Sequence, residues 1–171
     1  MERIRAHMPA MLELNRREKA LLSICAALLV AILVITCLAI NIRTNMQREY
    51  SNVRNQLGQA LYSDLYMLTQ TFDMTSVPNA DIKNAVIPQM KNYFIASTAI
   101  NEQLRTIYGA RYQVLSDADV NTLRAAFNAY DAAFRSDAPT DLVQADMQLC
   151  MNRVKELLSG RFNEGILRAT R

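Results

Sequence analysis

Residues 20–40 read ALLSICAALLVAILVITCLAI and contain no charged side chain. A helix rises about 1.5 Å per residue, so this run would extend about 31 Å, close to the thickness of the hydrocarbon core of a bilayer. A cleaved signal peptide has a shorter apolar core with small residues at its cleavage site. This core is longer, follows a leader of 19 residues and ends with a poor cleavage pair, Cys37 and Ala39. We therefore interpret residues 20–41 as an uncleaved transmembrane signal-anchor helix.

The basic residues on the two sides of this span predict its orientation, because Lys and Arg favour the cytoplasmic side. Five of them lie in the short basic leader, residues 1–19, and the nearest three after the span are Arg43, Arg48 and Arg54. This balance favours a cytoplasmic N-terminus and an extracytoplasmic C-terminal bundle in a single-pass protein of the cell membrane. The opposite orientation stays open, because the lone downstream thiol of Cys150 also suits a cytoplasmic domain.

The composition after the span excludes several classes of partner and site. Residues 42–171 carry 14 basic and 13 acidic residues, and this near-neutral balance gives no electrostatic footprint for nucleic acid. Two of the three cysteines, Cys25 and Cys37, lie in the span, so Cys150 has no partner for an internal disulfide or a cysteine-based metal site. We expect Cys150 to behave as a small buried hydrophobic residue.

Apolar residues recur in steps of three and four from residue 42 to residue 72. This period predicts that the span continues outward as one long amphipathic helix. Asp73–Pro78 contains turn-forming residues and should end that helix. The apolar positions are Ile42, Met46, Tyr50, Val53, Leu57, Leu61, Leu65, Leu68 and Phe72.

Three further amphipathic helices are predicted downstream. The first runs from about Asn79 to Tyr108 with Pro88 inside it and Gly109 as its C-terminal cap. The second opens at Ser116 in the style of a capping box, and the third is capped by Thr140 with Asp141 and ends at Gly160. Their predicted core positions are Ile82, Val86, Met90, Phe94, Ile100, Leu104 and Ile107; Val120, Leu123, Phe127, Tyr130 and Phe134; and Val143, Met147, Cys150, Val154 and Leu157.

The short links between these segments predict an antiparallel bundle of about four helices. The fold class is therefore all-α: one N-terminal transmembrane helix that continues into a long amphipathic helix, which packs in the bundle. The bundle domain should cover residues 42–160, and residues 161–171 should form a solvated basic C-terminal tail. No strand pattern is seen.

The sequence predicts no catalytic, cofactor-binding or metal site. His7, the only histidine, lies in the leader, which removes haem ligation, Ser-His-Asp or Cys-His catalysis and di-iron ligand pairs from the bundle. Asp117 and Asp119 suit the positive end of a helix rather than a metal. We expect a non-enzymatic protein without cofactors; a Ser-Lys or carboxylate-only enzyme is the alternative that needs no histidine.

Two surfaces are candidates for contacts with partners. Within the span, Ser23, Ala27 and Ala31 form a small-residue face that would let two anchors approach in a parallel homodimer. On the long helix, Tyr62 and Tyr66 are four residues apart and therefore share a face, where the amphipathic tyrosine ring suits a protein partner. The bilayer itself is the first predicted partner, and the identity of any protein partner is not encoded in these patterns.

These features favour a membrane-anchored interaction or scaffold module at the cell envelope. The first alternative is a sensor-like bundle that binds a ligand outside the membrane, as in chemoreceptors. Those receptors have two spans, whereas residues 142–158, the nearest second candidate, carry Asp146, Arg153, Lys155 and Glu156.

Two family resemblances follow from these residues. The short leader, single span and helical bundle, with the segment Val86-Ile-Pro-Gln-Met90, resemble the LemA family of bacterial membrane proteins. That resemblance implies a helical membrane protein of unknown activity. The segment Asn15-Arg-Arg-Glu-Lys-Ala-Leu-Leu22 at the start of the span is similar to type II secretion and type IV pilus assembly proteins, which add a small α/β domain that has no counterpart here.

Overall fold

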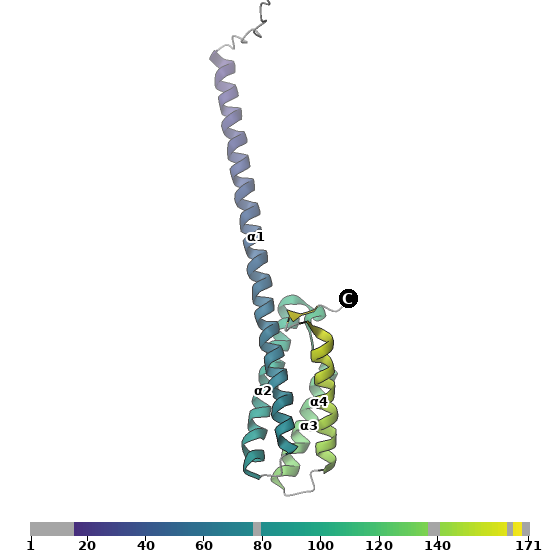
Figure 1. The fold of residues 1–171 in the computed structure, drawn as a ribbon. Coiled ribbons are helices and arrows are strands. Elements are labelled where there is room, and N and C mark those ends of the chain that lie inside the picture. Colours follow the sequence, from purple (N-terminus) through teal and green to yellow (C-terminus); the bar gives the residue numbers. More distant parts are fainter. Residues whose placement is uncertain (1–15, 77–79, 137–140, 164–165, 169–171) are drawn as a thin grey trace, which may run out of the picture. The chain divides into compact units, whose positions relative to one another are not determined.

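A computed structural model describes residues 16–76, 80–136, 141–163 and 166–168, and it divides into two compact units, residues 1–49 and 50–171. The chain in this description is almost entirely helical, so the predicted all-α fold class is confirmed (Figure 1). The elements in chain order are α1 (Arg16–Asp73), η1 (Met74–Ser76), α2 (Ala80–Tyr108), η2 (Ala110–Tyr112), α3 (Asp117–Arg135), α4 (Asp141–Arg161), β1 (Phe162–Asn163) and β2 (Ile166–Leu167).

The first unit consists, in its described part, of the N-terminal portion of α1. Among the described residues, α1 is the one helix long and apolar enough to cross a membrane: its most apolar 18-residue window has a mean hydropathy of 3.0 and is 0% buried. Leu21, Leu33 and Ile40 are each about 60% exposed, which is unusual for large apolar side chains. The predicted leader lies mostly outside the described residues.

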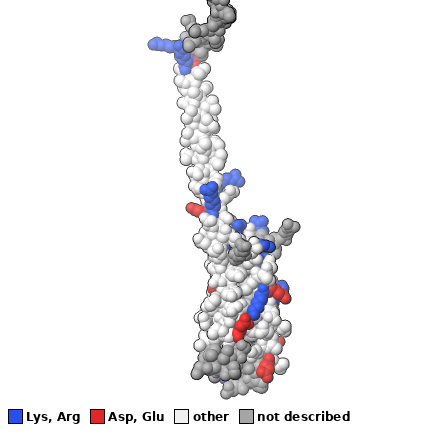
Figure 2. All heavy atoms as spheres, viewed as in Figure 1, with Lys and Arg blue, Asp and Glu red and all other residues white. Residues whose placement is uncertain are grey.

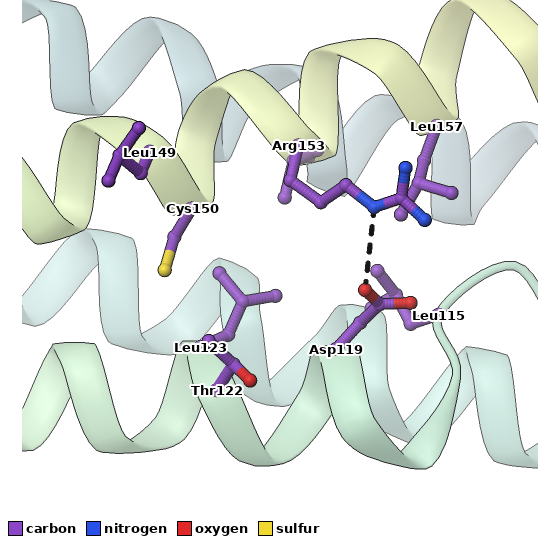
Figure 3. A pocket seen from close by; sticks show the side chains of 9 residues that line it. Leu115, Asp119, Thr122, Leu123, Leu149, Cys150, Arg153 and Leu157 are labelled. Atoms are coloured by element: carbon purple, nitrogen blue, oxygen red, sulfur yellow. Dashed lines mark ion pairs between the residues drawn. The ribbon is translucent and has the colours of Figure 1, made fainter.

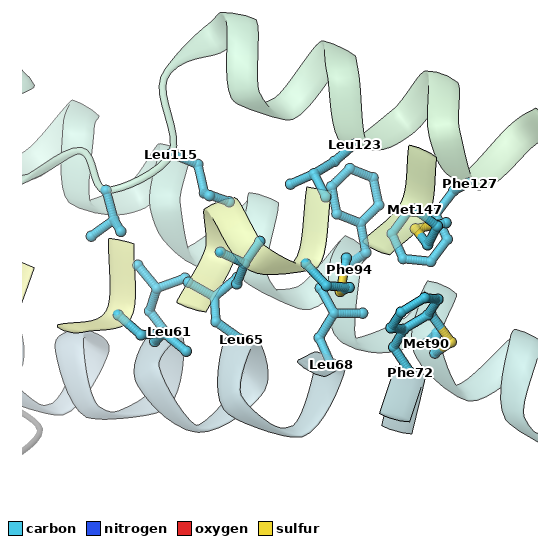
Figure 4. Packing of buried hydrophobic residues seen from close by; sticks show 14 of the residues in the cluster. Leu61, Leu65, Leu68, Phe72, Met90, Phe94, Leu115, Leu123, Phe127 and Met147 are labelled. Carbon is cyan, nitrogen blue, oxygen red and sulfur yellow. The ribbon is translucent and has the colours of Figure 1, made fainter. Parts of the chain in front are cut away.

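The second unit is a bundle in which the C-terminal part of α1 packs with α2, α3 and α4. Consecutive helices run in opposite directions, as the sequence predicted (Figure 1). Figure 4 shows the core, where Leu61, Leu65 and Leu68 of α1 face aromatic and methionine side chains of the other helices. These three leucines are 0% exposed, which fits the close packing of protein interiors.

The predicted core positions are partly right. On α1 the stripe is buried from Leu61 to Phe72, but Tyr50 and Val53 are exposed. On α2, Ile107 was predicted to lie in the core but is exposed. Ile87, which was not predicted, is buried. On α4 the predicted positions Met147 and Val154 are buried, and Val143, Cys150 and Leu157 are half-buried at the edge of the core. The other two buried positions, Met151 and Leu158, were not predicted.

The predicted C-terminal cap of α2 and the predicted N-terminal cap of α3 are both confirmed. Gly109 has φ of 92°, a region that favours glycine, and its N–H donates to the Arg105 carbonyl at 2.9 Å. At the start of α3, the Asp119 N–H donates to Ser116 Oγ at 3.1 Å, and the Ser116 N–H donates to Asp119 Oδ2 at 3.0 Å. These two bonds form the capping box. Pro88 lies inside α2 without ending it.

Asn101 fixes the connection between α2 and α3, a role that sequence patterns did not indicate. Its Oδ1 accepts the N–H groups of Val114 at 2.8 Å and Leu115 at 2.9 Å, and its Nδ2 donates to the Leu115 carbonyl at 2.9 Å. Asn101 is 3% exposed, so this amide satisfies three buried backbone groups that would otherwise be costly.

The expectation of a solvated tail and of no strands is wrong for residues 162–163 and 166–167. Phe162 pairs with Leu167, and Asn163 pairs with Ile166, in a two-stranded antiparallel hairpin. Phe162 and Leu167 are both buried, so this hairpin closes the end of the bundle core. Two-residue strands leave almost no periodic signal. The arginines on both sides of this segment also led us to assign its apolar residues to a basic tail. Phe162 and Leu167, which were assigned to the tail, therefore belong to the packed core.

The hairpin approaches α1 at Gly58. A Cβ atom at this position would lie 2.9 Å from the Leu167 Cβ, closer than side chains normally approach. Glycine weakens a helix interior, so its presence in α1 is explained by this contact.

We predict that Gly58→Ala lowers the free energy of unfolding by about 1 kcal/mol, because steric strain against Leu167 outweighs the gain in helix propensity. The matched control is Gly160→Ala in α4, where no atom lies within 4 Å of the added Cβ. That control should leave stability unchanged or raise it by up to about 1 kcal/mol. Denaturant unfolding of the full chain in detergent measures both, and equal stabilisation by the two changes would contradict the packing of Leu167 on α1.

Candidate functional site

The two tyrosines predicted as a partner surface line a groove between α1 and the C-terminal part of the bundle. The groove has a volume of about 520 Å³. Side chains of α1 form one wall, and side chains of α4 and β1 form the other. The lining residues are Tyr62, Tyr66, Thr69, Gln70, Lys155, Leu158, Ser159 and Phe162.

The aromatic rings of this groove have different exposures. Tyr62 and Tyr66 are stacked, with ring centroids 6.2 Å apart and planes at 9°, as expected for residues four apart on a helix. Tyr62 is half-buried, because its ring also meets Phe162 edge to face at 5.3 Å. Tyr66 stays 45% exposed. The hairpin therefore fixes Tyr62, and Tyr62 in turn positions the exposed ring of Tyr66.

A polar rim surrounds these rings. Lys155 Nζ lies 3.1 Å from Asp73 Oδ2, which ties α4 to the end of α1 beside the groove. Gln70 and Ser159 are exposed, and the Thr69 hydroxyl donates to the Tyr66 carbonyl at 2.8 Å. A surface with exposed aromatic area and a polar rim resembles the anatomy of protein interfaces.

A second, smaller pocket lies between α3 and α4 (Figure 3). Its volume is about 190 Å³, and its walls are mostly leucine and valine side chains. Arg153 crosses its mouth, with Nε 3.5 Å from Asp119 Oδ1. Pockets that enclose small organic ligands usually measure about 300 to 1,000 Å³. This pocket therefore lends no support to the sensor-like alternative.

Cys150 faces this pocket but is a poor nucleophile. Burial raises the pKa of its thiol, and the negative charge of Asp146 raises it further. The thiol is therefore protonated near neutral pH, whereas nucleophilic cysteines act as thiolates.

Two half-buried carboxylates of the bundle, Asp119 and Asp131, are structural partners, whereas burial raises the pKa of a third, Asp64. Burial alone would raise the pKa of Asp119, but hydrogen bonds from Ser116 and the charge of Arg153 outweigh it and set the pKa below its ordinary value. The pKa of Asp131 is also lowered, first by the hydrogen bond from Lys91 at 2.5 Å and then by Arg135. Both groups are ionised at neutral pH and engaged by cations, so neither has the raised pKa of a general acid.

The described residues contain no group of three or more His, Cys, Asp or Glu side chains that could hold a metal ion. His7 lies outside the described residues. Ser23, Ala27 and Ala31 lie on one side of α1 and are exposed, and the Ser23 hydroxyl donates to the Ala20 carbonyl at 2.9 Å. Their role in self-association stays a prediction.

The groove residues contributed by α4 and β1 were missed from the sequence. Leu158 was overlooked because the stripe of α4 was drawn one residue away, and Phe162 was assigned to the tail. The sequence signal that could have identified this wall is Phe162 itself, a large apolar residue immediately after Gly160-Arg161.

We predict that Asp119→Asn makes stability less sensitive to acid. Because the folded-state pKa of Asp119 is lowered, its ionised form stabilises the fold above the unfolded value of about 3.9, and this contribution is lost as pH falls through the folded value. At pH 7 the variant should be less stable by about 1 kcal/mol, since it loses the capping carboxylate. Urea unfolding at pH 7 and pH 3 should show the two chains converging at low pH; a constant difference would contradict this role.

Comparison of the chain with protein-family models, with curated proteins and with solved structures finds no match. Neither family resemblance noted in the sequence gains support from these comparisons, and the function has to be argued from the helix, the groove and the charges described above.

Proposed function

We propose that this chain is a non-enzymatic, single-pass membrane protein whose helical bundle serves as an interaction module at the cell envelope. The observation that carries the proposal is the uncharged run of residues 20–40, whose large side chains lie exposed on α1. Water would penalise this exposed apolar area by about 25 cal/mol per Å², whereas lipid would not. A bilayer is the solvent that such a surface fits.

The orientation in this proposal follows from the leader. The leader holds five basic residues, three of them, Arg16, Arg17 and Lys19, at the start of the apolar run. The nearest basic residues after the run are three in number and more widely spaced. The positive-inside rule then favours a cytoplasmic leader and an extracytoplasmic bundle.

The absence of an enzymatic role in this proposal rests on the chemistry of the described side chains. The carboxylates with lowered pKa values are engaged by cations, and the thiol of Cys150 has a raised pKa. The single histidine of the chain, His7, precedes the apolar run. Function must be argued from a site, and the site this bundle offers is a surface rather than a reaction centre.

The surface we assign to a protein partner is the groove at Tyr62 and Tyr66. Its exposed ring, its apolar floor at Leu158 and its polar rim match the composition of interface cores and rims. Self-association through Ser23, Ala27 and Ala31 would bring two grooves into one assembly and increase binding by multivalency.

The orientation can be tested with a single cysteine. Ser136→Cys, at an exposed position after α3, is introduced into a chain with Cys25, Cys37 and Cys150 replaced by Ala. A membrane-impermeant maleimide should label it in intact cells, whereas Glu2→Cys in the leader should be labelled only after lysis. Labelling of Ser136→Cys only after lysis would reverse the orientation. Release of the protein from membranes by alkaline carbonate would contradict the span itself.

The groove can be tested with a photo-crosslinking amino acid at Tyr66 in living cells. We expect a discrete crosslinked product from this position and none from the control position Asn128, which is exposed on α3. Ser159→Arg, which places a bulky cation in the groove, should reduce the product at least about tenfold, because filling an interface core costs more than about 1.4 kcal/mol. Equal products from both positions would remove the groove from the proposal.

A further inference from the structure

Two leucines on α4 are the most exposed large apolar side chains in the described part of the chain. Leu142 is 83% exposed and Leu149 is 68% exposed, which is more than any large apolar side chain of the run in α1. They are seven residues apart and therefore lie two turns apart on one side of α4. Leu149 also lines the pocket between α3 and α4, so it belongs to a continuous apolar surface. Such a surface on a packed domain indicates a contact with a partner.

The neighbouring helix α3 carries small residues on the side opposite its core face. Its buried positions are Leu123, Phe127 and Tyr130, whereas the small residues are all exposed and follow one another in alternating steps of four and three. Small side chains at this spacing leave holes that large side chains of another helix can fill. We call these positions the small-residue stripe: Ala118, Thr122, Ala125, Ala129 and Ala132.

The ion pair between Asp119 and Arg153 sets the relative height of α3 and α4, with Arg153 Nε 3.5 Å from Asp119 Oδ1. The two helices run antiparallel (Figure 1). A residue after Asp119 is therefore level with the residue that lies the same number of positions before Arg153. Leu149, four positions before Arg153, is level with Leu123, and both side chains line the pocket.

The same relation places both exposed leucines at the height of gaps in the small-residue stripe. Leu142 lies 11 positions before Arg153 and is level with Tyr130. The repeat of seven residues between the leucines matches the repeat of seven residues along the stripe, from Ala125 to Ala132. Leu149 is thus at the height between Thr122 and Ala125, and Leu142 is at the height between Ala129 and Ala132.

We propose that the face formed by α3 and α4 binds a second copy of this chain, with the exposed leucines of each copy packed against the small-residue stripe of the other. A two-fold axis parallel to the helices places α4 of one copy over α3 of the other and keeps every residue at its own height. Each copy then supplies two leucines and receives two, as a symmetric, self-complementary interface requires.

The charges on this face are complementary to those of a second copy in the same arrangement. Asp119 and Arg153 lie at one height, so four charged groups of alternating sign would surround the two-fold axis. Each Arg153 then lies between the Asp119 of its own chain and the Asp119 of the second copy. The Arg153 side chain is 57% exposed, which leaves it accessible to a second carboxylate. Basic and acidic atoms both occur over α4 on the face drawn in Figure 2, so a second copy meets no field of a single sign.

The dimer does not depend on the proposed anchor, because all of its contacts come from α3 and α4. It is nevertheless compatible with an anchor. A two-fold axis parallel to the helices brings the α1 segments of both copies into the dimer from the same end, as two chains that share one bilayer require.

The contact is tested with two differently tagged full-length chains expressed in the same cells, with Cys25, Cys37 and Cys150 replaced by Ala in both. One chain carries Leu149→Cys and the other carries Ala125→Cys. Oxidation of the cells with copper phenanthroline should join the two tags by a disulfide, because the proposed packing brings these two positions together.

The matched controls carry the same substitution in both chains. Two copies of position 149, or of position 125, lie diagonally across the two-fold axis, so these products should form at least about tenfold more slowly, since a disulfide needs Cα atoms within about 7 Å. Absence of the mixed product would overturn the dimer, and so would control products that form as fast as the mixed one. Ala27→Leu, which would disrupt the predicted contact between spans, should leave the mixed product unchanged.

A bulky charge in the small-residue stripe should weaken the contact. Ala129→Arg, added to both cysteine chains, should slow formation of the mixed disulfide at least about tenfold, because it fills the hole for Leu142 and places a charge in an apolar contact. Ala99→Arg, at an exposed alanine of α2, is the matched control and should have no effect. Both alanines are exposed, so both variants should keep the thermal midpoint of the parent chain. An unchanged rate in a folded Ala129→Arg protein would contradict the packing.

Asp146 provides a test in the opposite direction. It lies one turn before Cys150, which lines the pocket, and seven positions before Arg153, so it is level with Ala126. A second copy presents no cation at that height. Asp146→Asn should therefore maintain or increase the rate of crosslinking, whereas a decrease of about tenfold would contradict the proposed register.

The dimer and the proposed anchor fail separately. Release of the protein by alkaline carbonate would remove the span and leave the mixed disulfide in place. Conversely, absence of the mixed disulfide from a protein that resists carbonate would remove the dimer and leave the membrane proposal intact.

Discussion

Burial of one apolar stripe on α1 is the interaction on which the bundle depends. Leu61, Leu65 and Leu68 are fully buried against side chains from the other helices, and each contributes about 2 kcal/mol of stabilisation relative to an exposed position. The stripe continues to Phe72, and the hairpin residues Phe162 and Leu167 close the core at its other end. The capping box of α3 and the amide of Asn101 set where the chain turns, but the helices that they position are held together by this core.

The same helix presents two kinds of apolar surface, and the contrast is informative. From Leu21 to Ile42 its large side chains are mostly between 50% and 66% exposed, whereas from Leu61 to Leu68 the stripe has no exposed area. When a helix has an apolar stripe on one side and charged residues on the other, packing the stripe against protein is enough to remove it from water. A helix that is apolar all round has no polar side to turn toward water, so it needs an apolar solvent on every side. One helix therefore carries the evidence for both the bundle and the proposed anchor.

Local signals predicted much of this fold because they act over a few residues. The period of three and four, the turn at Gly109 and the box at Ser116 each depend on near neighbours, and each was correct. On α4 the core face was only partly correct, because Cys150, Met151, Leu157 and Leu158 give two nearly equivalent stripes and only the packing of the bundle chooses between them. The hairpin was missed for a related reason: Phe162 and Leu167 are buried by contact with α1, where Gly58 makes room, and nothing near them in the sequence records that contact.

The candidate site also combines features that local sequence signals predict with features that depend on long-range contacts. Tyr62 and Tyr66 could be predicted as a pair because they are four residues apart on one helix, but the opposite wall of their groove comes from residues about 90 positions later. The exposure of Tyr66 beside the half-buried ring of Tyr62 depends on Phe162, which meets Tyr62 edge to face. This contact exists only once α1 and β1 have packed together, so folding of the bundle creates the groove.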